Sequence, residues 1–264
     1  MILEDIIRHK RKELKALKTS RPLEGLKKEL SRSKISRGPF LKALRKKNGM
    51  AVIAEIKRRS PSKGALCWNF EPVRIARSCQ KGGAAALSVL TDRKFFGGSP
   101  EILTRVKKSV RIPVLRKDFI VDEYQLFESK KMGADAVLFI VRCLSLDELK
   151  NFYALAQKIG LEVLFEVHDE VDLKKISPLK PRLVGVNNRD LSSFKVDLNT
   201  TRRLARRVPG GALLVSESGI FEAKQLSQLK KWGVKAALVG ESLMKEKDPG
   251  LALERLLGKT RDSR

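Results

Sequence analysis

The chain has 264 residues, 42% of them hydrophobic, which is enough material for one large α/β barrel or two smaller domains. No apolar run approaches the ~18 to 20 residues that cross a bilayer, and the charged start is unlike a signal peptide, so we expect a cytoplasmic protein. Three cysteines argue against a disulfide framework, and two histidines argue against a multi-histidine metal site and a Ser-His-Asp triad. The net charge of +26 raises the question of an acidic partner.

The first 50 residues are basic and predict an extension of one to three helices. They hold 16 Lys and Arg against 5 Asp and Glu, and the runs ILEDIIRHKRKELKAL and PFLKALRKK carry Leu and Ile at helical spacing. Such an arm could bind nucleic acid. It contains a single aromatic residue, Phe40, and no nucleic-acid-binding motif, so we favour a solvated basic face and expect no nucleic-acid partner.

From residue 51 onward, short β-favouring runs alternate with longer amphipathic runs. Near-continuous apolar strands such as AVLFI and ALLV are typical of a parallel sheet buried on both faces, and eight strand-plus-helix units predict a (β/α)₈ barrel. A doubly wound open sheet is the alternative, but it would show a glycine-rich fingerprint where this chain has Ser-Pro-Ser. We therefore expect one domain over residues 1–264, with strands at 51–57, 85–90, 112–116, 135–140, 162–167, 182–187, 212–217 and 236–240.

Two of the intervening helices carry capping signals. Ser99 is a predicted N-cap, followed by Pro100 at the first helical position and Glu101 in the first turn. A second helix begins after Ser145 and ends near Gly160. These helices are predicted to be scaffold.

Polar residues fall at the carboxyl ends of five predicted strands, which is where a barrel places its active site. Taken singly, each has a structural explanation, such as an outward-facing side chain or a solvated turn. Their coincidence with strand ends indicates a functional site. The residues are Glu55, Lys57, Lys117, Asp118, Glu166, Asn187, Arg189, Glu217 and Ser218.

The last two strand ends also predict a phosphate site. Small residues in SESGI and LVGES let backbone N–H groups approach an anion, although tight turns that need glycine would look the same. The candidates are Ser218, Gly219, Gly240 and Glu241. The carboxylate of Glu241 would repel phosphate unless it turned away.

These segments together resemble the indole-3-glycerol phosphate synthase family, whose fold is a (β/α)₈ barrel. The resemblance covers roughly residues 50 to 245, in the family's order and with near-family spacing. It also implies that residues 1–50 form a helical cover over the barrel mouth. The matching segments are IAEIKRRSPSKG, ALSVLTDRKFFGGS, IPVLRKDFIVDEYQ, GADAVLFI, LEVLFEVHD, VGVNNRDL, SESGI and LVGESLM.

The resemblance implies closure of 1-(2-carboxyphenylamino)-1-deoxyribulose 5-phosphate to an indole, with loss of CO₂ and water and with no cofactor or metal. It makes Lys117 the general acid for ring closure, with Glu166 assisting proton transfer. Lys57 would hold the substrate carboxylate and could share acid duty in the dehydration. Which lysine is the better acid stays open. The resemblance places Glu55 and Asn187 in the dehydration, with Glu217 as a further rim carboxylate.

The resemblance also assigns the binding residues. Ser60, Ser218, Gly219, Gly240 and Glu241 would take the phosphate, with Glu241 standing where some relatives have a small hydroxyl residue. The pocket for the aromatic ring would be formed by Leu90, Phe96 and Arg189.

Two other functions were weighed against this one. Phosphoribosylanthranilate isomerase is another phosphate-binding barrel, but it leaves the lysine pair and SPSKG unexplained. A basic-surface binding protein on a barrel scaffold would explain the net charge and not the rim residues. We expect a monomer whose partner is a small sugar phosphate.

Overall fold

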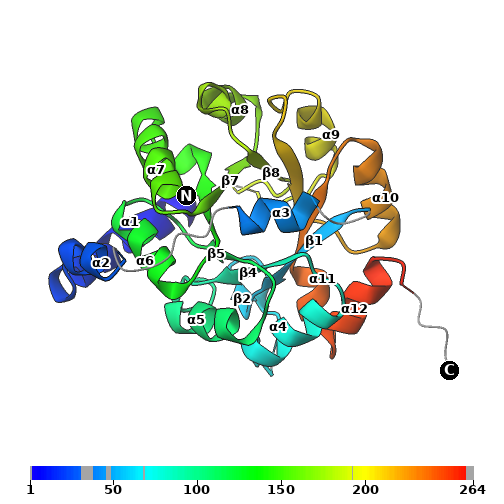
Figure 1. Cartoon of the computed structure of the whole chain (residues 1–264). Coiled ribbons are helices and arrows are strands. Elements are labelled where there is room, and N and C mark those ends of the chain that lie inside the picture. The colour runs from blue at the N-terminus through cyan, green and yellow to red at the C-terminus, as the bar shows by residue number, and fades with distance from the viewer. Residues whose placement is uncertain (1, 31–37, 46–48, 68, 192, 260–264) are drawn as a thin grey trace.

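Eight parallel strands form a closed barrel, which confirms the predicted (β/α)₈ fold (Figure 1). The structure is a computed structural model that describes residues 2–30, 38–45, 49–67, 69–191 and 193–259. Around the barrel the order is β1-β10-β9-β8-β7-β6-β5-β4, and β4 pairs with β1 to close it. The strands are β1 (Ala51–Ile56), β4 (Ala86–Leu90), β5 (Val114–Lys117), β6 (Ala136–Ile140), β7 (Glu162–Val167), β8 (Leu183–Asn187), β9 (Leu213–Glu217) and β10 (Ala236–Val239).

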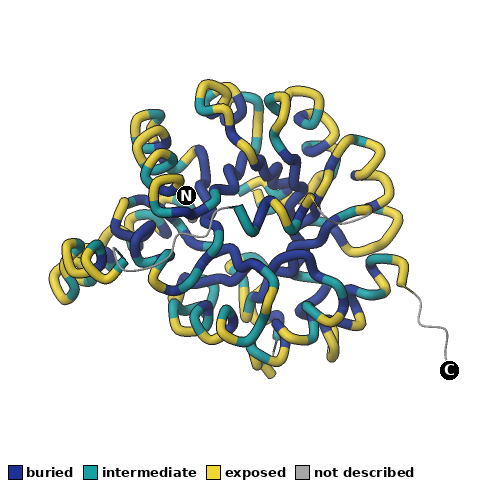
Figure 2. Tube along the Cα trace, in the orientation of Figure 1, coloured by how far each residue is buried: buried dark blue, intermediate teal, exposed yellow. Residues whose placement is uncertain are grey.

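Each predicted strand corresponds to one of these eight. The largest displacement is in β5, which begins at Val114 and not at Ile112. Pro113 precedes it, and a proline has no N–H to donate to a ladder. Figure 2 shows the strands as the most deeply buried part of the chain, and side chains of all eight barrel strands and the surrounding helices form one continuous core.

The helices form an outer ring around the strands (Figure 1). Ser99 caps α5 by accepting a hydrogen bond from the N–H of Ile102, and Ser145 and Glu148 form a capping box at α7, so both capping predictions are confirmed. The ring contains α4 (Pro72–Lys81), α5 (Pro100–Ser109), α6 (Tyr124–Met132), α7 (Leu146–Lys158), α8 (Glu170–Ile176), α9 (Asn199–Ala205), α10 (Ala223–Lys231), α11 (Glu241–Met244) and α12 (Pro249–Leu256), with short 3₁₀ turns η1 (Val141–Cys143) and η2 (Ser177–Leu179). Among the residues that the structure describes, no helix is long and apolar enough to cross a membrane.

The described residues of the N-terminal extension form three helices, two at opposite ends of the barrel and one on its side. In α3 (Pro39–Arg45), Phe40, Leu41 and Leu44 are buried against the first residues of the strands, and the N–H groups of Phe40 and Leu41 donate to Glu162 at the start of β7. This helix therefore closes the amino-terminal end and does not lie over the mouth. Residues 1, 31–37 and 46–48 of the expected cover lie outside the described residues.

The first helix, α1 (Ile2–Ser20), reaches the opposite, carboxyl-terminal end. Its Leu3 and Ile6 line the cavity there, and Lys10 forms ion pairs with Asp92 after β4 and Asp118 after β5, both at 3.2 Å. The second helix, α2 (Leu23–Leu30), packs on the side of the barrel against α6. The three described helices of the basic extension are thus each packed against the barrel.

Candidate active site

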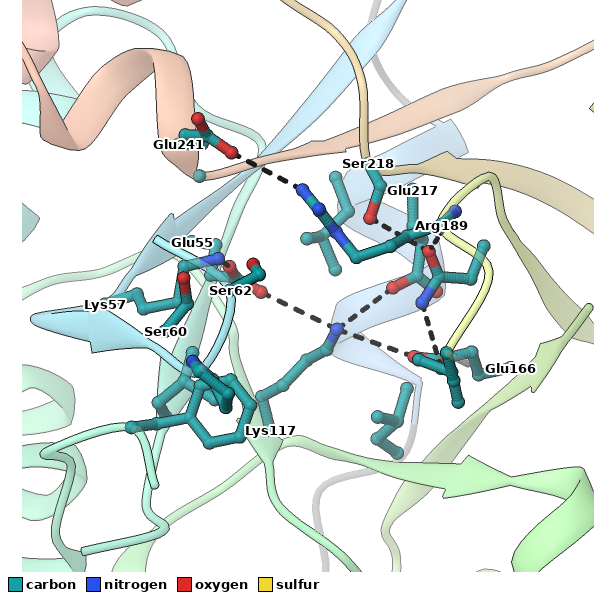
Figure 3. Close-up of a pocket in the computed structure, with 18 of the residues that line it drawn as sticks. Glu55, Lys57, Ser60, Ser62, Lys117, Glu166, Arg189, Glu217, Ser218 and Glu241 are labelled. Atoms are coloured by element: carbon teal, nitrogen blue, oxygen red, sulfur yellow. Dashed lines mark hydrogen bonds and ion pairs between the residues drawn. The ribbon is translucent and has the colours of Figure 1, made fainter. Parts of the chain in front are cut away.

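One cavity at the carboxyl-terminal end of the barrel brings together every residue that the sequence singled out as catalytic, phosphate-binding or ring-binding (Figure 3). The cavity is lined by the ends of several strands and the loops that follow them, as expected for this fold. The fourteen residues are Glu55, Lys57, Ser60, Leu90, Phe96, Lys117, Glu166, Asn187, Arg189, Glu217, Ser218, Gly219, Gly240 and Glu241. Asp118 also lines it.

Lys117 lies at the centre of this cavity. Its Nζ atom is 3.1 Å from Glu217 of β9, 3.5 Å from Glu166 of β7 and 3.6 Å from Glu55 of β1. Figure 3 shows the ammonium group pointing at all three carboxylates. Because each carboxylate comes from a different strand, only the closed barrel can assemble this group.

Lys57 belongs to the same cluster. Its Nζ atom contacts one oxygen of Glu55 while Lys117 faces the other oxygen. The two ammonium groups, which are 60 residues apart in the sequence, therefore share one carboxylate. A bound molecule in the cavity would meet two cations from two strands.

The pKa values of Lys117 and Glu55 are shifted in opposite directions by the charges that they share. Burial lowers the pKa of Lys117, but Glu217, Glu166 and Glu55 outweigh it and raise the pKa well above its usual range. Burial would raise the pKa of Glu55, yet Lys57 and Lys117 hold it at about 2. At neutral pH the site therefore contains a protonated Lys117 beside an ionised Glu55.

Glu166 and Glu217 share Lys117 but differ in their protonation. Although burial raises the pKa of Glu166, Lys117, His168 and the amide of Asn187 bring it below its usual value. Burial raises the pKa of Glu217 to about 7, with Glu166 and Glu55 adding to the rise against the opposing Lys117. One carboxyl stays ionised while the other can exchange a proton near neutral pH, as acid–base chemistry requires.

Asn187 fixes the geometry between these groups. Its side-chain amide donates to Glu166 at 3.1 Å, and its carbonyl oxygen accepts from the N–H of Arg189 at 3.0 Å and from the hydroxyl of Ser218 at 2.9 Å. Ser218 has a left-handed backbone with φ 68°, which is unusual for a residue other than glycine. A strained backbone of this kind persists only where surrounding contacts hold it, and such residues cluster at functional sites.

The predicted phosphate residues line the same cavity but come from three parts of the chain: β2 (Arg59–Ser60), the end of β9 and the end of β10. Ser60 comes from β2, which pairs with β3 (Gly64–Ala65) in a small hairpin that the sequence did not predict. Gly240 approaches Glu55 so closely that a Cβ atom there would lie 2.6 Å from its Oε1. Glu241 is paired with Arg189 at 3.4 Å and with Lys245 at 2.7 Å, so its carboxylate is neutralised by neighbouring cations.

Leu90 and Phe96 form an apolar wall. Asp92 accepts hydrogen bonds from the N–H groups of Phe95 and Phe96, which fixes the loop after β4, and the rings of Phe96 and Phe119 lie 6.1 Å apart. Phe119 also lines the cavity. The sequence could have suggested this, because Phe119 directly follows the predicted site residues Lys117 and Asp118. Sequence reasoning also missed other lining residues, which lack a polar signal: Leu3, Ile6, Pro61, Leu138, Ile140, Leu191, Phe194, Ile220, Phe221, Leu238 and Val239.

The cavity offers acids, bases and cations for reactions of an anionic ligand. No group of three or more His, Cys, Asp and Glu side chains in the described ranges could hold a metal ion. The chemistry that the side chains themselves can supply is proton transfer from Lys117, proton exchange at Glu217 and attraction of a substrate anion by the two lysines.

The chain is similar in sequence to the proteins of one family. Residues 3–256 match the sequence model of a family described as indole-3-glycerol phosphate synthase. A protein of that name from Polaromonas naphthalenivorans is 45% identical over 260 residues, covering 97% of this chain and 98% of its own. Another from Caldanaerobacter subterraneus subsp. tengcongensis is 46% identical over 245 residues, covering 93% and 94%.

Solved structures with the same fold include the tryptophan synthase alpha subunit from Legionella pneumophila. It superposes with a TM-score of 0.63 over 84% of this chain and 97% of its own, at 15% sequence identity. At that identity the likeness concerns the barrel alone.

Proposed function

Because the chain belongs to the indole-3-glycerol phosphate synthase family, we propose that the residues gathered around Lys117 carry out that family's reaction. The enzyme closes 1-(2-carboxyphenylamino)-1-deoxyribulose 5-phosphate to indole-3-glycerol phosphate in tryptophan biosynthesis, with loss of CO₂ and water, and is a carboxy-lyase. The observation that carries the assignment of roles is the position of the Lys117 ammonium within 3.6 Å of three carboxylates from three other strands.

Ring closure begins with attack of the aromatic carbon that bears the carboxylate on the substrate carbonyl. Lys117 donates a proton to the carbonyl oxygen, which becomes a hydroxyl group, and Glu166 assists the transfer beside it. The raised pKa of Lys117 supports this role, because it ensures that the proton is present when the substrate arrives. The lysine does not yield that proton to water, but the oxyanion that develops during ring closure is basic enough to accept it.

The substrate carboxylate then leaves as CO₂. Lys57 lies beside Glu55 at the rim, where its cation would hold this carboxylate next to the reacting carbon. Loss of CO₂ returns the bonding electrons to the ring, and its aromaticity is restored. We also assign Lys57 a share of the acid role in the next step.

Dehydration removes the hydroxyl group formed in ring closure. An acid protonates it so that it departs as water, and a base takes a proton from the five-membered ring to complete the indole. We assign Glu55 and Asn187 to this step. Glu217 is the further carboxyl, and its pKa of about 7 would let it give and take a proton at neutral pH.

The two ends of the substrate are assigned to different parts of the cavity. Leu90, Phe96 and Arg189 would take the aromatic ring, with the Arg189 guanidinium also paired to Glu241 at 3.4 Å. The phosphate would be held by Ser60, Ser218, Gly219, Gly240 and Glu241. At Glu241 the backbone N–H, and not the side chain, would make the contact. Pairing of the Glu241 side chain with Arg189 and Lys245 supports this assignment, because it reduces the repulsion between carboxylate and phosphate.

A direct assay tests the function. Purified protein supplied with the carboxyphenylamino sugar phosphate should produce indole fluorescence, and a phosphate-free analogue should react with kcat/KM lower by about 10²-fold or more. Persistent absence of the fluorescence would discard the assignment. Equal rates with and without the phosphate would contradict the assignment of the phosphate-binding residues but not the assignment of ring closure.

We further propose that the protein acts as a cytoplasmic monomer, that α1 covers the mouth of the single domain, and that the net charge of +26 does not serve nucleic-acid binding. The pairing of Lys10 with Asp92 and Asp118 supports a docked α1. Weak binding to duplex DNA that disappears by physiological salt is expected. Tight binding with a steep salt dependence would overturn that part of the proposal.

A further inference from the structure

His168 is a buried polar residue that the proposed reaction does not use. It follows Glu166 by two positions at the end of β7, its side chain is 5% exposed, and it does not line the cavity. Neither ring nitrogen has a hydrogen-bond partner among the residues that the structure describes. Burying a polar group without a hydrogen-bond partner is unfavourable, so an imidazole at this position calls for a physical reason.

Two carboxylates flank the ring. Nε2 is 3.4 Å from Oε1 of Glu166, and Nδ1 is 3.6 Å from Oδ2 of Asp172. These separations exceed a hydrogen bond by a few tenths of an ångström, since N–H···O bonds extend to about 3.2 Å. A small rotation of the ring or of either carboxylate, such as a bound substrate would cause, closes the gap.

Asp172 holds the outer side of the ring in place. It accepts the backbone N–H of His168 at 2.9 Å and lies 3.0 Å from the guanidinium of Arg142. A ring nitrogen can donate to a carboxylate oxygen only where it carries an N–H, so contact with both Asp172 and Glu166 requires an N–H on each nitrogen. In that form the Nδ1–H faces Asp172 and the Nε2–H is directed toward Glu166.

Glu217 lacks such support. Glu166 and Glu217 both contact Lys117, but Glu166 also has Asn187 and His168 behind it, whereas Oε1 of Glu217 has no hydrogen-bond partner in the described ranges. The two carboxyls therefore differ chiefly in the donors that surround them. Their opposite titration behaviour agrees with that difference.

We propose that His168 is a positioning residue for Glu166: it donates from Nε2 to Oε1 and, held by Asp172, keeps the Glu166 carboxylate ionised and aimed at Lys117. The inference rests on the proposed role of Glu166 in proton transfer. Other charged or titratable groups around the ring are Arg142 and Cys143 of η1 and Lys175 of α8. Burial raises the pKa of the Cys143 thiol to about 12, so this group is neutral in the range of interest.

Three substitutions separate a positioning role from a packing role. His168→Gln can place a donor where Nε2 lies, His168→Asn can place one only where Nδ1 lies, and His168→Leu removes both. We expect the glutamine variant to keep kcat within about threefold of the unchanged enzyme. The asparagine and leucine variants should lose about 10- to 100-fold in kcat with little change in KM, as when a reacting group is misplaced by up to ~1 Å.

The pH profile supplies a second readout. His168 lowers the pKa of Glu166, so its loss should raise that pKa and move the acid limb of kcat to higher pH in the asparagine and leucine variants. Equal losses in all three variants, or unchanged kcat and pH profile in the asparagine variant, would overturn the proposal. If the leucine variant fails to fold, the glutamine and asparagine variants decide the matter.

A measurement without turnover keeps this inference separate from the proposed function. Carboxyl ¹³C NMR of the full chain, assigned with Glu166→Gln, should show Glu166 titrating at higher pH in His168→Asn than in the unchanged protein. An unmoved titration would overturn the role of His168 even in an active enzyme. A shifted titration in a protein that forms no indole would support His168 while contradicting the proposed function.

Discussion

The two ends of the barrel are closed by different chemistry. At the amino-terminal end, α3 inserts Phe40, Leu41 and Leu44 among the apolar first residues of the strands. At the carboxyl-terminal end, Leu3 and Ile6 of α1 reach a cavity of buried charges, and Lys10 fastens the helix to two aspartates. One helical extension thus contributes packing at one end and ionic contacts at the other.

The difference separates stability from reactivity. Apolar burial at the α3 end contributes about 25 cal/mol for each Å² removed from water. The Glu162 carboxylate at that end accepts hydrogen bonds from the N–H groups of Phe40 and Leu41. At the mouth, Glu55, Lys117, Glu166 and Glu217 are taken out of water, and their mutual attraction at best offsets that cost. Substitutions at the mouth should therefore change kinetics, whereas those at the other end should change stability.

The largest kinetic effect is expected from Lys117→Met. Loss of the general acid should lower kcat by roughly 10² to 10⁴-fold or more. The thermal midpoint should be preserved, because the three carboxylates that lose their shared cation can bind protons or water in its place. Stopped assays of indole formation together with thermal unfolding measure both quantities. A tenfold effect or less would reassign the acid role to Lys57.

At the opposite end, Phe40→Ala should lower the free energy of unfolding by about 3–5 kcal/mol, because it leaves a cavity under the strands. The values of kcat and KM should stay within about twofold, since Phe40 lies far along the strands from the site. Val171→Ala, at an exposed position, is the matched control and should change stability by ~0.5 kcal/mol or less. A large loss of activity in folded Phe40→Ala would break the separation of the two ends.

Gly185→Ala tests how closely the mouth is fitted. A Cβ at Gly185 in β8 would lie 2.1 Å from Oε1 of Glu217, so the carboxylate must move toward the cavity. We expect kcat to fall about 10- to 100-fold, with a loss of about 1–3 kcal/mol in stability from overpacking.

The control for that substitution is Gly210→Ala, where an added Cβ meets nothing within 4 Å. Adding Glu217→Asp to Gly185→Ala should relieve the overlap and restore stability but not activity. Unchanged kcat in Gly185→Ala would mean that the position of Glu217 is not critical.

The smallest effect in this series is expected from Lys10→Met. The Lys10 side chain is 4% exposed, and its removal leaves Asp92 and Asp118 without the cation that joins them to α1. The helix should detach more often, raising KM by roughly threefold to tenfold while the barrel stays folded.

Amide hydrogen exchange in α1 would report the loosening, and Lys12→Met, on the exposed side of the same helix, is the control. Faster exchange without any rise in KM would show that α1 does not serve as a cover.

Much of the fold could be predicted because local pattern determines it. The near-continuous apolar runs at 136–140 and 212–215 and the cap at Ser99 each depend on neighbours in sequence. The hairpin at Arg59–Ser60 could not be anticipated, since two-residue strands leave no periodicity. Nor does amphipathicity reveal which end of the barrel a helix such as α3 will cover.

The site was predictable to the extent that strand ends meet at one rim. That rule placed Lys117 and Glu217 together although 100 residues separate them. It could not show that Lys10 reaches Asp118 or that Arg189 pairs with Glu241, because long side chains choose partners by three-dimensional packing. His168 was passed over because a single histidine after a strand has no distinctive spacing.

The most direct test is a crystal structure of the protein with indole-3-glycerol phosphate bound. The phosphate should lie against Ser218, Gly219 and Gly240, and the indole should rest on the wall formed by Leu90 and Phe96 with its ring within contact of Lys117. Product bound with its phosphate elsewhere, or with Lys117 turned away from the indole, would contradict the account of the site.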